Sequence, residues 1–189
     1  MKAPELLAAL EKAPIIAAVK STDGLEKCLS CDSKVVFILF GNILDIAEIV
    51  SKIKAADKLA FVHIDLIEGL SPREISVDFI KQNTHADGII STKQNLVHYA
   101  KSKDLLTIQR FFLLDSLALA NVQKQVDSVC SDLVEILPGV MPKIIRKLAQ
   151  ASSKPIIAGG LISEKDDIIS ALDAGALAIS STNPAIWFM

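Results

Sequence analysis

The chain has 189 residues, of which 51% are hydrophobic and 5% aromatic, and its formal net charge is -2. A chain of this length buries one sizeable core, so we expect a single domain over residues 1–189. The slightly negative charge excludes a global attraction to nucleic acid or membranes and leaves only local basic patches. No apolar run reaches the roughly 20 residues that cross a bilayer, so we expect a cytoplasmic protein with no membrane partner.

The predicted elements alternate along the chain. Residues 1–13 begin "MKAPELLAALEK", which is typical of a short amphipathic helix before the first strand and not of a cleavable signal. Segments with helical periodicity, such as "NILDIAEIVSKIKAA", separate short apolar runs that are typical of buried strands. The eight strand-like runs are, in order, "PIIAAV", "KVVFILF", "LAFVHIDL", "DGIIST", "LLTIQRFFL", "LVEILP", "KPIIAGG" and "ALAISST".

Eight strand–helix units predict a compact (β/α)8 TIM barrel with a truncated last helix, because only "PAIWFM" follows the eighth strand. An open doubly wound sheet is the competing fold. The similarity of residues 86–92 to residues 176–182 favours a barrel of two repeated halves, although strands often share such composition. We expect the segment from about Pro4 to Lys12 to cover the surface or base that a full last helix would cover. If it does not, the apolar patch left there favours a homodimer.

The seventh and eighth strands end in residues suited to phosphate. In such barrels the loops after these strands commonly bind phosphate together with a short extra helix. Glycine amides, hydroxyl groups and a terminal helix capped by Asn183 would together make an anion site without an arginine. Tight packing of strand against helix is the alternative reason for the glycines. The candidate phosphate ligands are Gly159, Gly160, Ser180, Ser181 and Thr182.

Charged residues interrupt otherwise apolar strands. Burying a charge is costly unless it is paired, so we expect these side chains to converge at the mouth of the barrel, with Glu68 joining from the third loop. A structural salt-bridge network is the alternative to a binding role. His63 lies deeper than Asp65 and is better explained as a core histidine. The other candidate pocket residues are Lys20, Asp65, Lys93, Arg110 and Glu135.

Such a pocket suits a small phosphorylated ligand that carries hydroxyl groups, and it serves a sensor or an enzyme equally well. An enzyme would use Lys20 or Lys93 as a reactive amine or base, or a carboxylate to abstract a proton next to a carbonyl. No metal motif or cofactor motif is evident, because the three histidines are dispersed. Cys28 and Cys31 form C-x-x-C, which fits a thiol role or two small packed residues.

Longer strings give a family resemblance. The runs "HIDLIEGL", "IQRFFLLDS", "LPGVMPK" and "KPIIAGGLISEKDD" are similar to the bacterial glycerol-3-phosphate-responsive antiterminator family, and the match extends from about Pro14 to Met189. The resemblance implies a cytoplasmic, non-enzymatic regulator of glycerol-utilisation operons. With glycerol 3-phosphate bound as effector, such a protein binds leader mRNA and prevents transcription termination. A barrel enzyme acting on a small phosphorylated substrate is the alternative function.

RNA binding would need a local basic patch, since aromatic residues are scarce and the chain shows no motif with stacked aromatics. Lys143, Arg146 and Lys147 fall within one to one and a half helical turns and form one candidate patch. Lys101, with Lys93, His98 and Lys103, belongs to a second candidate patch. Each set is equally compatible with a plain solvated helix face.

Overall fold

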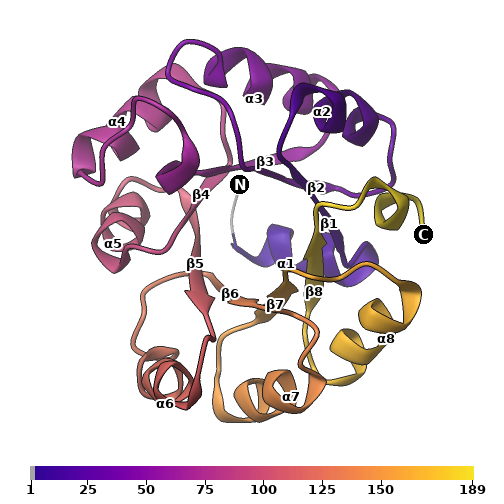
Figure 1. The fold of residues 1–189 in the computed structure, drawn as a ribbon. Coiled ribbons are helices and arrows are strands. Elements are labelled where there is room, and N and C mark those ends of the chain that lie inside the picture. Colours follow the sequence, from indigo (N-terminus) through magenta and orange to yellow (C-terminus); the bar gives the residue numbers. More distant parts are fainter. Residues whose placement is uncertain (1–2) are drawn as a thin grey trace.

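Eight parallel strands close into a barrel in the computed structural model, which describes residues 3–189 (Figure 1). The strands are β1 (Ile15–Val19), β2 (Val35–Ile38), β3 (Leu59–His63), β4 (Gly88–Ser91), β5 (Leu106–Phe112), β6 (Leu133–Leu137), β7 (Ile156–Gly159) and β8 (Ala178–Ser181). Each strand pairs with the next along the chain, and β8 pairs with β1, where Ile16 lies opposite Ser180. The predicted barrel is confirmed, and the open sheet is excluded.

Helices surround the barrel because each connection between parallel strands has to cross over its outer surface (Figure 1). In the third helix, apolar residues buried at helical spacing, such as Ile46, Ile49 and Ile53, face the strands. No helix of the described residues is long and apolar enough to span a membrane. The helices are α1 (Ala3–Lys12), α2 (Thr22–Leu29), α3 (Ile46–Ala55), α4 (Glu74–Asn83), α5 (Gln94–Ser102), α6 (Ser116–Gln125), α7 (Pro142–Ala151), α8 (Lys165–Asp173) and the short 3-10 helices η1 (Ile64–Leu66) and η2 (Pro184–Phe188).

Alternation along the strands separates an inner core from an outer core. Side chains such as Phe37, Phe61 and Ile108 fill the inside of the barrel, while their neighbours along the strands pack against the helices. Leu6 and Leu10 of α1 belong to the inner core and are 0% and 1% exposed. Helix α1 therefore plugs the base of the barrel, across the amino-terminal ends of the strands (Figure 1).

The truncated last helix is η2, a five-residue 3-10 helix. Its Trp187 is buried and donates a hydrogen bond from Nε1 to the carbonyl of Ser181, at 2.7 Å. Because η2 also contacts β1 and α2, it covers the outer side of the barrel that a full helix would cover. The segment from Pro4 to Lys12 thus covers the base, and the patch that would have favoured a homodimer there is not exposed.

Cys28 and Cys31 pack in the outer core beside α2. The Cys31 thiol donates to the carbonyl of Cys28 at 3.1 Å, and burial raises the pKa of the Cys28 thiol to about 12. A protonated, buried thiol is a poor nucleophile, so this arrangement favours the packing interpretation of the C-x-x-C sequence.

Replacing the plug tests its contribution to stability. Leu6→Ala leaves a void at the base of the inner core, so we expect the free energy of unfolding to fall by about 2–5 kcal/mol. Leu44→Ala is the matched control, because Leu44 is 90% exposed and its truncation should cost less than about 0.5 kcal/mol. Urea denaturation followed by circular dichroism measures both, and equal small losses would show that α1 adds little to the core.

Candidate functional site

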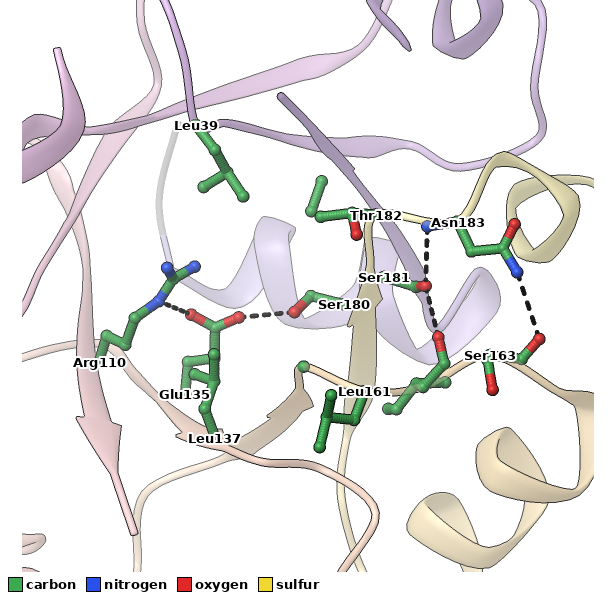
Figure 2. A pocket seen from close by; sticks show the side chains of 13 residues that line it. Leu39, Arg110, Glu135, Leu137, Leu161, Ser163, Ser180, Ser181, Thr182 and Asn183 are labelled. Carbon is green, nitrogen blue, oxygen red and sulfur yellow. Dashed lines mark hydrogen bonds and ion pairs between the residues drawn. The ribbon is translucent and has the colours of Figure 1, made fainter. Parts of the chain in front are cut away.

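A cavity of about 470 Å³ opens at the carboxyl ends of the strands. It is lined by residues from β1, β5, β6 and β8 and by the loops that follow β2, β7 and β8 (Figure 2). The end of a parallel barrel at which the strands finish is where such folds place their ligands. The cavity is therefore the candidate site.

The polar floor of the cavity is built around Glu135, which is fully buried. Arg110 donates from Nε to Glu135 Oε2 at 2.6 Å, and the Ser180 hydroxyl donates to Glu135 Oε1 at 2.6 Å. The two partners approach the carboxylate from opposite sides (Figure 2). The outer nitrogens of Arg110 make no hydrogen bond with any residue from 3 to 189, and the side chain borders the cavity. A ligand in the cavity can therefore use these two nitrogens as donors.

The loop after β7 supplies bare backbone amides. Gly160 and Leu161 have φ angles of +77° and +62°, and this left-handed conformation is uncommon for leucine. The amides of Leu161 and Ile162 donate to no acceptor in the described part of the chain, and both residues border the cavity. Unpaired amides and a guanidinium that border one cavity are suited to an anion. A phosphate group matches these donors because it carries several acceptor oxygens.

An aspartate at the start of α8 holds the other end of this loop. The backbone amides of Ser163 and Glu164 donate to Asp167 Oδ2 at 2.9 and 3.1 Å. The hydrogen bond from Ser163 keeps the pKa of Asp167 below its usual range. The loop is thus fixed beyond the two free amides, which leaves Leu161 and Ile162 as the donors facing the cavity.

The structure brings most of the predicted phosphate ligands to the cavity and changes the role of several. Gly160, Ser180, Ser181 and Thr182 border it, whereas Gly159 does not. A Cβ atom at Gly159 would lie 2.5 Å from both Glu135 Oε1 and Ser180 Oγ. Close packing of protein side chains therefore explains the first glycine, and a ligand contact at Gly159 stays a prediction without support from the cavity.

Several hydroxyl groups and helix amides that were expected to face an anion already form hydrogen bonds within the protein. Ser180 donates to Glu135, and Ser181 donates to the carbonyl of Ile162 at 2.8 Å. Asn183 caps η2 as predicted, but its Oδ1 accepts from the amide of Ala185, and its own amide donates to Ser181 Oγ. The sequence analysis did not identify the backbone amides of Leu161 and Ile162 as donors. The only sequence feature that pointed to them is the preceding Gly160.

The predicted convergence of charged side chains is correct only for Arg110 and Glu135. Lys20 and Lys93 are exposed and do not border the cavity. Both follow the last residue of their strands, so strand alternation does not hold their side chains at the mouth. Glu68 is also exposed, and its backbone bridges to Asn42.

Asp65 lies outside the cavity because β3 ends at His63 and the 3-10 helix η1 follows. Its carboxylate accepts from the Ser91 hydroxyl at 2.6 Å and from the Thr92 amide at 2.7 Å. Partial burial opposes ionisation of Asp65, but these hydrogen bonds still lower its pKa below the usual range. Asp65 thus joins the end of β3 to the end of β4.

His63 is 2% exposed and does not border the cavity, as expected for a core histidine. Burial lowers the pKa of its imidazole from 6.5 to about 4, and the charge of Arg110 adds to this effect. Its Nδ1 has no hydrogen-bond partner among residues 3–189. Within residues 3–189 no cluster of three His, Cys, Asp or Glu side chains could hold a metal ion.

The two candidate basic patches differ in their partners. Lys101 forms an ion pair with Asp132, and Lys103 forms one with Asp78. Lys143, Arg146 and Lys147 lie exposed on α7 and form no ion pair with another described residue. The structure therefore leaves the α7 patch free for an anionic partner.

The family model described as glycerol-3-phosphate responsive antiterminator matches residues 15–187. The chain belongs to this antiterminator family. The protein YgcP of Escherichia coli (strain K12), described as uncharacterized, is 42% identical over 96% of this chain and 95% of its own length.

Two solved structures are similar to this antiterminator family member over its whole barrel. The glycerol uptake operon antiterminator regulatory protein from Listeria monocytogenes is 32% identical, with a TM-score of 0.88 over 93% of this chain and 95% of its own. A glycerol uptake operon antiterminator-related protein from Thermotoga maritima is also 32% identical, with a TM-score of 0.80 over 93% and 98%. The resemblance inferred from the sequence is confirmed.

The buried histidine predicts a pH dependence of stability. Between pH 6.5 and 4 the unfolded antiterminator binds a proton at His63 that the folded protein does not, so stability falls as the pH drops through this window. The shift corresponds to a loss on the order of 3 kcal/mol. Urea denaturation at several pH values across this range gives the free energy of unfolding at each pH. For His63→Gln this free energy should depend less steeply on pH.

His85→Gln is the matched control, because His85 is exposed. Its free energy of unfolding should depend on pH as steeply as that of the unsubstituted protein. An unchanged slope in His63→Gln would contradict the assignment of a neutral, buried imidazole.

Proposed function

We propose that the chain is a cytoplasmic antiterminator that binds glycerol 3-phosphate as effector, needs no cofactor and binds leader mRNA. The observation that carries the proposal is the cavity that the free amides of Leu161 and Ile162 and the guanidinium of Arg110 border together. Family membership supports the choice of glycerol 3-phosphate among small phosphates.

The effector would bind with its phosphate on the loop after β7. Its phosphate oxygens accept from the amides of Leu161 and Ile162 and from the Thr182 hydroxyl. The glycerol hydroxyls then lie toward the polar floor, where Arg110 donates and the carboxylate oxygens of Glu135 accept. In this arrangement the loop after β7 provides affinity for the phosphate group. The polar floor distinguishes glycerol 3-phosphate from inorganic phosphate because it binds the glycerol hydroxyls.

A thermal-shift titration tests the pocket, because a ligand that binds only the folded protein raises its apparent stability. Glycerol 3-phosphate should raise the melting temperature, while glycerol and inorganic phosphate at the same concentration should have a smaller effect. Gly160→Asp should abolish the shift, since it places a carboxylate beside the free amides.

Gly175→Asp is the matched control. Gly175 also has positive φ, at +99°, but it lies between α8 and β8 and does not border the cavity. The control should lose stability and keep the effector shift. Loss of the shift in both variants would contradict the proposed pocket.

The α7 patch is the proposed RNA surface. Lys143, Arg146 and Lys147 occupy successive turns of a helix whose opposite face buries Ile145 and Leu148. Unpaired cations release counterions when they bind phosphates, which gives affinity and strong salt dependence. The ammonium of Lys101 already forms an ion pair with Asp132, so Lys101 contributes less to RNA binding.

Charge removal tests this surface. The triple replacement Lys143→Ala, Arg146→Ala and Lys147→Ala should weaken leader RNA binding in the presence of effector. It should also reduce the slope of log affinity against log salt by about 2–3. Lys101→Ala should change the slope much less. Filter retention at several salt concentrations measures both, and equal slopes for all proteins would contradict the assignment.

An enzyme acting on a small phosphorylated substrate is less well supported. That alternative needed Lys20 or Lys93 as reactive amine or base, and neither borders the cavity. Glu135, the carboxylate that does border it, already accepts hydrogen bonds from both Arg110 and Ser180. The geometry thus favours binding of the ligand over its chemical conversion.

A further inference from the structure

Exposed apolar side chains lie at the end of β5, in the loop and first turn of α6 that follow it, and in the loops after β6 and β7. Phe112, Leu114 and Leu117 are 49%, 85% and 69% exposed, and Leu161 is 74% exposed. We call Phe112, Leu114, Leu117, Val140 and Leu161 the apolar rim. Exposed apolar side chains beside a site are typical of a surface with a binding partner.

A groove lies between α6 and α7, which are neighbours in the ring of helices (Figure 1), and Leu114 of the apolar rim is one of the residues that line it. Its volume is about 260 Å³. Leu113 and Leu119 line the wall toward α6, and Met141 and Ile144 line the wall toward α7. Ile144 belongs to α7, the helix that also carries the three exposed cations of the α7 patch. One helix therefore contributes both to the groove and to the patch.

Backbone hydrogen bonds join both walls of the groove to the effector cavity. The amide of Leu113 donates to the carbonyl of Leu137 at 2.7 Å, and Leu137 borders the cavity. The amide of Gly139 donates to the carbonyl of Gly160 at 3.1 Å, in the loop that carries the free amides. A ligand bound to the free amides therefore contacts a loop that is hydrogen-bonded to the segment leading into α7. This link provides a physical path by which effector binding could favour one arrangement of the groove.

We propose that the apolar rim and its groove bind the bases of single-stranded RNA, with Phe112 as stacking platform, while the α7 patch holds the phosphates. The proposal rests on the proposed function. Proteins that bind single strands combine a cationic path for the backbone with side chains on which bases stack. The exposed cations of α7 favour RNA as the occupant, because a polyanion complements their charge.

Phe112→Ser tests the stacking platform, and Phe188→Ser is its matched control. Phe188 is 53% exposed but lies on η2, away from α6 and α7 (Figure 1). The probe is a fluorescent single-stranded RNA of random sequence, roughly 30 nucleotides long, in saturating glycerol 3-phosphate. We expect Phe112→Ser to lose roughly tenfold in affinity, measured by anisotropy. Phe188→Ser should bind as the unsubstituted protein does.

Effector binding is measured on the same proteins by thermal shift, and it should be unchanged in Phe112→Ser. Unchanged RNA affinity in Phe112→Ser, or equal losses in both variants, would overturn the inference. So would a dimer that Phe112→Ser dissociates with no change in RNA affinity, because the occupant would then be a second copy. If the unsubstituted protein binds neither this RNA nor leader RNA, the proposed function fails as well. That outcome is visible without any variant.

Discussion

A carboxylate buried at the mouth of a barrel has to be paired, because an unpaired buried charge costs several kcal/mol. Glu135 meets this requirement through Arg110 on one side and Ser180 on the other. Much of the site depends on this pairing. It keeps Arg110 at the cavity with two nitrogens that no other described residue binds, it takes up the hydroxyl of Ser180, and it excludes any side chain at position 159.

The same pairing bears on the difference between a sensor and an enzyme. A general base must be free to take a proton from its substrate. Both carboxylate oxygens of Glu135 accept protein hydrogen bonds, and neither candidate lysine reaches the cavity. The cavity instead offers stationary donors: amides in a loop that Asp167 fixes from its far side. Stationary donors suit recognition of a phosphate, and the loop that carries them is bonded to the segment leading into α7.

The barrel was predictable because eight apolar runs separated by helical periodicity leave few other topologies. The same reasoning placed Gly160 and the end of β8 at the cavity, since the phosphate loops of such barrels follow the last two strands. It failed for Asp65, because alternation along β3 stops where η1 begins. It also failed for Lys20 and Lys93, which lie just beyond their strands.

Gly159 shows a different limit of sequence reasoning. A glycine at a strand end indicates close approach of another atom, but the sequence does not say whether that atom belongs to a ligand or to the protein. Here the neighbours are Glu135 and Ser180, which are distant in sequence. The free amides of Leu161 and Ile162 were missed for a related reason, because backbone donors leave no residue-type signal.

The most direct test of the account is a crystal structure with glycerol 3-phosphate bound. We predict that the phosphate lies within hydrogen-bonding distance of the amides of Leu161 and Ile162, and that the glycerol hydroxyls point toward Arg110 and Glu135. A phosphate bound elsewhere on the barrel, with this cavity occupied only by water, would contradict the central claim.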